Sequence, residues 1–137
     1  MSKHAKQVVK DFYESDLLKD ETVLEKYFHP EAVLIWNSVN GLTTMHNEDL
    51  EAFFLEIRRT YFDLRIEVSH LLADENFVTI RYKYYVKTIE NPEEELGIAH
   101  FMGIWEVKDG KLYKGSQISQ PVTGNDDTSK SYKKVKV

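Results

Sequence analysis

Two histidines and two tyrosines are the side chains best suited to proton transfer in an apolar site. His70 and His100 each fall within a run predicted to be a strand, and Tyr82 and Tyr84 share one face of another. An imidazole has an unperturbed pKa of about 6.5, which suits a general base at neutral pH. A phenol in an apolar pocket can donate a hydrogen bond to a carbonyl or an enolate. His70, His100 and Tyr84 are therefore the candidate catalytic residues. The commoner alternative for such residues is a place in the core, with their polar atoms hydrogen-bonded to neighbours.

The sequence lacks the motifs of several common enzyme classes. It has no cysteine, which removes disulfides, thiolate nucleophiles and cysteine-ligated metals. Its histidines show no H-x-H, H-x-x-x-H or H-E-x-x-H spacing. There is no G-x-S-x-G elbow, phosphate-binding loop or dinucleotide fingerprint. We therefore predict no metal and no cofactor.

Three segments near the N-terminus are predicted to be helices. Residues 5–13 place apolar side chains on one face at helical spacing. A shorter helix follows Asp20, a good N-cap, and ends before Pro30. The third begins at the N-cap Asn47. Its apolar stripe consists of Leu50, Phe53, Phe54, Ile57 and Tyr61.

The remaining segments carry strand patterns. A short apolar strand is predicted at residues 32–36, and residues 62–72 and 78–86 form a hairpin in which apolar and polar side chains alternate. His70 lies on the predicted apolar face of its strand, and Tyr82 and Tyr84 lie on the predicted apolar face of the next strand. After a strand at 98–107, Asp109-Gly110 predicts a tight turn into a last strand at 111–120.

The strand at residues 98–107 is apolar on both sides. His100, Met102 and Ile104 lie on one side, and Phe101 and Trp105 on the other. Such a strand is covered on both faces. If helices cover one face of the sheet, a second copy of the chain is the simplest cover for the other, so we predict a homodimer through the sheet.

Length and composition predict one domain at residues 1–123, followed by a polar tail at 124–137. The 137 residues suit a single core, and no window approaches the ~20 apolar residues of a membrane-spanning helix. A net charge of −5 disfavours nucleic acid as a partner. The N-terminus has no apolar signal-peptide core, so we expect a cytoplasmic protein with no membrane partner.

The segment 18–36, with its His29-Pro30-Glu31-Ala32-Val33 run, and the Lys108-Asp109-Gly110-Lys111-Leu112 turn resemble the nuclear transport factor 2-like superfamily. Within it, the SnoaL-like proteins are the most similar, over roughly residues 5–122. The resemblance implies an α+β fold in which a cone-shaped, curved antiparallel sheet wraps around three N-terminal helices. It also implies an apolar cavity, often in a homodimer. Enzymatic members, such as ketosteroid isomerase and polyketide cyclases, use Asp, His or Tyr as acid–base groups.

On this fold, the ligand-binding candidates are the aromatic residues and their neighbours expected around the cavity. They are Tyr13, Trp36, Phe54, Tyr82, Met102, Trp105, Gln117 and Gln120. Gln117 and Gln120 stand where many SnoaL-like chains carry an acidic residue, and an amide cannot abstract a proton. This departure favours a binder over a carboxylate-based catalyst.

Three functions follow as alternatives. The favoured one is a domain that binds a small apolar or aromatic molecule in its cavity. The second is a cofactor-free isomerase, dehydratase, cyclase or hydrolase that uses a histidine–tyrosine pair. The third is a structural or protein-interaction dimer with a filled interior. An open cavity would favour ligand binding or catalysis over a purely structural role. A histidine within that cavity would favour catalysis over binding alone.

Overall fold

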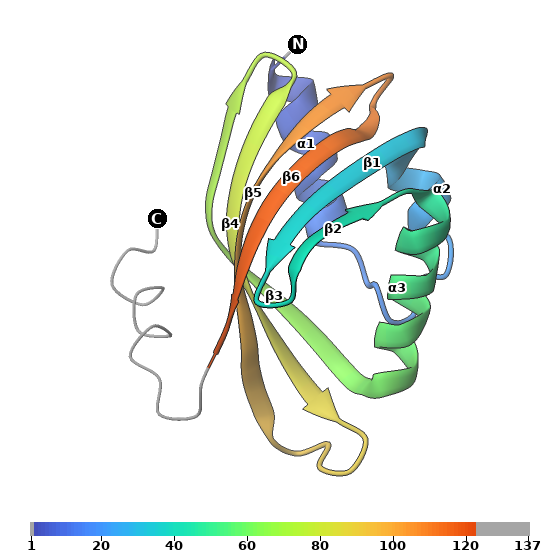
Figure 1. Cartoon of the computed structure of the whole chain (residues 1–137), viewed down its shortest axis with the longest axis vertical. Coiled ribbons are helices and arrows are strands. Elements are labelled where there is room, and N and C mark those ends of the chain that lie inside the picture. The colour runs from blue at the N-terminus through green and yellow to red at the C-terminus, as the bar shows by residue number, and fades with distance from the viewer. Residues whose placement is uncertain (1, 123–137) are drawn as a thin grey trace.

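The computed structural model describes residues 2–122, so the predicted tail at 124–137 lies outside the described residues. Its helices and strands follow the order α1 (Ser2–Tyr13), α2 (Val23–Tyr27), β1 (Phe28–Ser38), β2 (Gly41–Met45), α3 (Asn47–Thr60), β3 (Tyr61–Asp74), β4 (Phe77–Thr88), β5 (Glu95–Lys108) and β6 (Lys111–Pro121). The predicted α+β class and its strongly curved sheet are confirmed, with the helices on the concave side (Figure 1).

The six strands form one sheet in the order β2-β1-β6-β5-β4-β3. β1 and β6 pair in parallel, and the other neighbours pair antiparallel. The parallel pair joins a strand from the first third of the sequence to a strand from the last third, and Trp36 lies beside Gln117 in the register. The Trp36 Nε1–H group donates a hydrogen bond of 2.8 Å to the Ser119 hydroxyl. Residues far apart in the chain thereby form one wall.

Strand β2 was not predicted, and the strand before it is longer than expected. β1 runs over Phe28–Ser38, where the sequence predicted only residues 32–36. In β2, the residues before Met45 are exposed, so the segment lacks the apolar alternation that marks a half-buried strand. Pairing with β1, rather than burial, makes this segment a strand.

The start of α3 differs from the prediction by one residue. His46 is the N-cap, and its backbone N–H group donates to the Asp49 carboxylate at 2.9 Å. The Asn47 amide instead donates to the backbone carbonyl groups of His29 and Pro30, at 3.2 and 2.7 Å. Asn47 therefore ties α3 to the first residues of β1.

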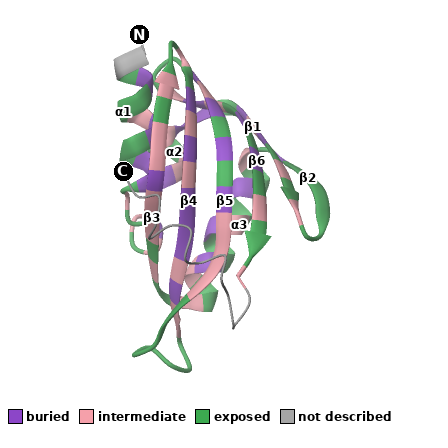
Figure 2. Ribbon diagram, turned by 90° about the vertical axis from the view of Figure 1, so that its left-hand side faces the viewer, coloured by how far each residue is buried: buried purple, intermediate pink, exposed green. Residues whose placement is uncertain are grey.

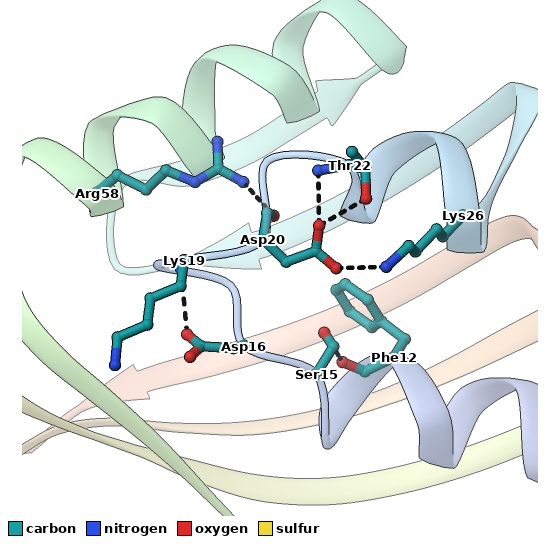
Figure 3. A network of polar contacts seen from close by, with 8 residues as sticks. All are labelled: Phe12, Ser15, Asp16, Lys19, Asp20, Thr22, Lys26 and Arg58. Atoms are coloured by element: carbon teal, nitrogen blue, oxygen red, sulfur yellow. Dashed lines mark hydrogen bonds and ion pairs between the residues drawn. The ribbon is translucent and has the colours of Figure 1, made fainter.

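The loop between α1 and α2 is fixed by polar side chains (Figure 3). Arg58 of α3 donates from Nε to the Leu17 carbonyl at 2.9 Å and from Nη2 to the Asp20 carbonyl at 3.0 Å. The Asp20 carboxylate pairs with Lys26 at 2.8 Å and also accepts hydrogen bonds from Thr22, and these contacts lower the pKa of Asp20. Asp20 thus organises a turn before α2, which begins at Val23.

The concave side of the sheet and the three helices enclose an aromatic core. The predicted face of α1 is buried at Ala5, Val9, Phe12 and Tyr13. Phe12 packs edge-on against Phe28, with ring centroids 4.9 Å apart, and Phe28 packs on Trp105 at 5.7 Å. Within residues 2–122, none of the helices has the length and apolar character needed to cross a bilayer.

Candidate ligand-binding site

A cavity of about 500 Å³ lies on the concave side, between the sheet and α3. Its walls come from strands β1 to β6 and from one face of α3. Most of the lining is apolar: Trp36, Val39, Met45, Phe53, Ile57, Leu64, Ile98, Ala99, Phe101 and Pro121, together with the ring of Tyr84. The cavity therefore suits a mainly apolar molecule.

Trp36 is a fixed wall of this cavity. Its indole packs edge-on against Phe53 of α3, with centroids 5.4 Å apart, and lies 5.9 Å from Phe101. The Ser119 hydroxyl accepts the indole N–H and also lines the cavity. Because that hydroxyl accepts from Trp36, its own proton remains available for a ligand.

A smaller hollow of about 30 Å³ continues inward, enough for about one water molecule. It shares Trp36, Met45, Phe53 and Tyr84 with the cavity. Its other lining residues are Phe12, Tyr13, Phe28, Leu34, Leu50, Phe54, Tyr82, Trp105 and Gln117. The polar atoms at this inner end belong to tyrosines, tryptophans and one glutamine.

A chain of hydrogen bonds crosses the inner end. Trp105 Nε1–H donates to the Tyr13 hydroxyl at 3.0 Å, and Tyr13 also bonds to Tyr82. The Tyr82 hydroxyl donates to Gln117 Oε1 at 3.0 Å. Tyr13 and Tyr82 thereby link Trp105 to Gln117 in one connected chain. Burial raises the pKa of Tyr13, so it stays a neutral phenol.

Tyr84 lies next to this chain but outside it. Its ring packs 5.7 Å from Tyr82 and 4.7 Å from Phe101, and the residue is buried. Among residues 2–122, its hydroxyl has no hydrogen-bond partner. Burial raises the pKa of Tyr84, and the charge that Tyr13 would carry if it ionised raises it further. Tyr84 is thus a neutral donor facing the cavity and not a base.

The structure brings most of the sequence-predicted site residues together. Trp36 and Tyr84 line the cavity, and a second group lines the inner hollow. That group comprises Tyr13, Phe54, Tyr82, Trp105 and Gln117. The residues that the structure places elsewhere are His70, His100, Met102 and Gln120, none of which is in the lining of either space.

His70 lies outside the cavity because of a β-bulge in β3. The register shifts between Val68 and His70, so that Ser69 and His70 both lie opposite Arg81. The prediction of uninterrupted alternation over residues 62–72 is therefore wrong. His70 Nδ1 lies 3.0 Å from the Ser69 hydroxyl, which also accepts a hydrogen bond from Arg81.

His100, Met102 and Gln120 belong to the convex face of the sheet. On β5, Phe101 and Trp105 are buried on the concave side, whereas Met102 and Ile104, which alternate with them, are exposed on the other side. Figure 2 shows this alternation of buried and exposed residues along β5. His100 pairs with Gln120 of β6 in the register, and Gln120 is exposed. The predicted division of β5 into two sides is confirmed, and the cavity lies on the Phe101 side.

The sequence reasoning missed several lining residues, of which Glu56 has the most chemistry. Among residues 2–122 it is the one carboxylate in the cavity lining, and its Oε2 accepts a hydrogen bond from the Thr60 hydroxyl at 3.0 Å. Helical spacing from Phe53 could have placed it on the same face of α3. Across the described part of the chain, no three His, Cys, Asp or Glu side chains group as metal ligands.

Comparisons with known proteins agree with this architecture. The SnoaL-like domain family matches residues 9–114. AusH from Aspergillus nidulans superposes with a TM-score of 0.71 at 12% identity, over 90% of this chain and 88% of its own. IdmH from Streptomyces antibioticus, a candidate polyketide cyclase, gives 0.69 at 15% identity, over 84% and 91%. An LEH-like epoxide hydrolase of M. tuberculosis gives 0.67 at 13% identity, over 86% and 84%.

A search of curated proteins finds no match. The solved structures are too distant in sequence to show more than a shared fold.

Proposed function

The chain belongs to the SnoaL-like domain family, and from this premise we propose that it binds a small, mainly apolar molecule in the cavity beside Trp36 and Phe53. The observation that carries the proposal is the cavity itself. Its volume of about 500 Å³ lies within the usual range of small-molecule sites, and its walls are mainly apolar. A domain with only a structural role would be expected to fill this space with side chains.

Binding is better supported than catalysis by a histidine. Neither His70 nor His100 is in the lining of the cavity or of the inner hollow, so neither of these histidines shares those two spaces with Tyr84. The carboxylate of Glu56 is exposed and bonded to Thr60. Tyr84 is held as a neutral donor. The apolar side chains that make up most of the lining are suited to holding an apolar molecule in place.

The test is the stabilisation of the protein by tetralin, a bicyclic hydrocarbon small enough for the cavity. A ligand that binds only the folded state raises the unfolding temperature as its concentration exceeds Kd. At about ten times Kd we expect an increase of about 3–5 °C for a domain of this size. No increase up to the solubility limit, for tetralin and for larger polycyclic hydrocarbons, would contradict the proposal.

We further propose that the convex face of the sheet pairs with a second copy of the chain. Met102, Ile104 and Ile118 are at least half exposed on this face, and Met102 lies opposite Ile118 in the register. Three large apolar side chains on neighbouring strands form a contiguous patch of the kind that subunit interfaces cover. Light scattering at micromolar concentration should give twice the monomer mass, and Ile104→Asp should halve it. A wild-type monomer would contradict the pairing.

A further inference from the structure

Glu56 is the one side chain in the cavity lining, among residues 2–122, that is charged at neutral pH. Within that part of the chain, no lysine, arginine or histidine lines the cavity. The Thr60 hydroxyl donates one hydrogen bond to the Glu56 carboxylate, which can accept about four. The carboxylate therefore offers both acceptor sites and a negative charge to a ligand.

Glu56 stands at the mouth of the cavity, where α3 ends. Phe53, Glu56, Ile57 and Thr60 line the cavity together, at the spacing of one helix face. Ile57 is buried and Phe53 half-buried, whereas Glu56 and Thr60 are exposed, so the carboxylate is at the solvent end of this face. α3 ends at Thr60, and the C-terminal end of a helix carries partial negative charge. The helix thus adds to the negative potential at the mouth.

The two arginines in the last turn of α3 are placed away from the cavity. Arg58 donates to the backbone carbonyl groups of Leu17 and Asp20 in the loop between α1 and α2 (Figure 3). Arg59 is exposed and is not in the cavity lining. The charge that a ligand meets at the mouth is therefore that of the carboxylate.

Aromatic rings line the space into which Glu56 opens. They belong to Trp36, Phe53, Tyr61, Tyr84 and Phe101. The face of an aromatic ring attracts an ammonium group and also packs against hydrocarbon. Rings together with a carboxylate complement an organic cation, whereas the same carboxylate repels an organic anion.

We propose that the cavity selects apolar cyclic amines, with the protonated nitrogen at the mouth against Glu56 and the hydrocarbon part between Trp36 and Phe53. This inference rests on the proposed function and specifies the charge of the ligand. The net charge of −5 on the chain also favours the approach of a cation.

The experiment compares 2-aminotetralin, a cation at neutral pH, with tetralin-2-carboxylate, an anion on the same skeleton. The quantity measured by isothermal titration is the ratio of their dissociation constants, carboxylate over amine. In the wild-type protein, at a salt concentration of about 0.1 M, we expect a ratio of at least about five. Glu56→Gln should lower this ratio about fivefold, because it removes an attraction for one probe and a repulsion for the other. The affinity for uncharged tetralin should not change.

Glu51→Gln is the matched control. Glu51 is exposed on another face of α3 and lines neither the cavity nor the inner hollow. Its replacement changes the net charge by the same amount, and it should alter the ratio by less than about 1.5-fold, since salt screens distant exposed charges. In Glu56→Gln the glutamine oxygen can still accept from Thr60, so this variant should fold.

The outcomes distinguish this inference from the proposed function. If tetralin binds and the ratio is the same in the wild-type protein and in Glu56→Gln, the amine site is wrong and the cavity proposal stands. A ratio that falls as much in Glu51→Gln would show that net charge alone sets the preference, and it would also overturn the amine site. If none of the three probes binds, both proposals are overturned.

Discussion

Replacing Gly115 by alanine is expected to destabilise the fold by about 2–4 kcal/mol. A Cβ atom at this position would lie 2.6–2.7 Å from three atoms of the Trp105 ring. Trp105 cannot easily retreat, because Phe28 packs on its ring and its N–H group is bonded to Tyr13. The estimate combines about 1–3 kcal/mol for overpacking with about 1 kcal/mol for the strained hydrogen bond. Urea unfolding followed by tryptophan fluorescence measures the loss.

A neighbouring residue and a double mutant control this prediction. Ser116→Ala changes the next residue, which is exposed on the opposite face, and should alter stability by less than about 0.5 kcal/mol. Trp105→Leu removes the ring that the new methyl group would meet. The cost of Gly115→Ala should therefore shrink in the Trp105→Leu background, as coupled residues require. An equal cost in both backgrounds would show that the clash with Trp105 is not the cause.

Ala99→Phe is expected to weaken the binding of tetralin at least tenfold without unfolding the protein. Ala99 is half-buried on β5 and lines the cavity opposite Tyr84 in the register. A phenyl ring added here would occupy space that the ligand needs, and the cavity offers room for it without displacing core side chains. A tenfold loss corresponds to about 1.4 kcal/mol. Isothermal titration and thermal unfolding measure the two effects.

Met102→Phe is the matched control for this substitution. Met102 lies on the same strand but on the convex face, where it is exposed. Enlarging it should leave the affinity for tetralin within about twofold of the wild-type value. A folded Ala99→Phe protein that binds tetralin as tightly as the wild-type protein would place the ligand outside the cavity.

Much of the fold was predictable because it depends on local periodicity. The stripe of α1 and the two sides of β5 repeat over enough residues to be read from sequence, and both are confirmed. The bulge at Ser69 was not predictable, because the extra residue is accommodated by the pairing with Arg81 on the next strand. It leaves no pattern in the sequence of β3 itself. That single residue moves His70 from the predicted inner face.

The candidate site was predictable in its residue types and less so in its positions. Trp36 and Tyr84 were found because aromatic residues fall on strands that the fold curves around its interior. Gln117 was found through the resemblance to SnoaL-like chains, many of which carry an acidic residue at its position. Gln120 was grouped with Gln117, but residues three apart on a strand point to opposite faces, and the structure buries Gln117 alone. Glu56 and Ser119 line the cavity because distant segments meet there, which a single sequence does not reveal.

The methyl resonances of the two internal methionines test the cavity proposal most directly. Met45 lines both the cavity and the inner hollow, whereas Met102 is exposed on the convex face. In protein labelled with ¹³C-methyl methionine, titration with tetralin should shift the Met45 resonance to saturation and leave that of Met102 unchanged. A saturable shift of Met102 with none at Met45 would show that the ligand binds the convex face and would contradict binding in the cavity.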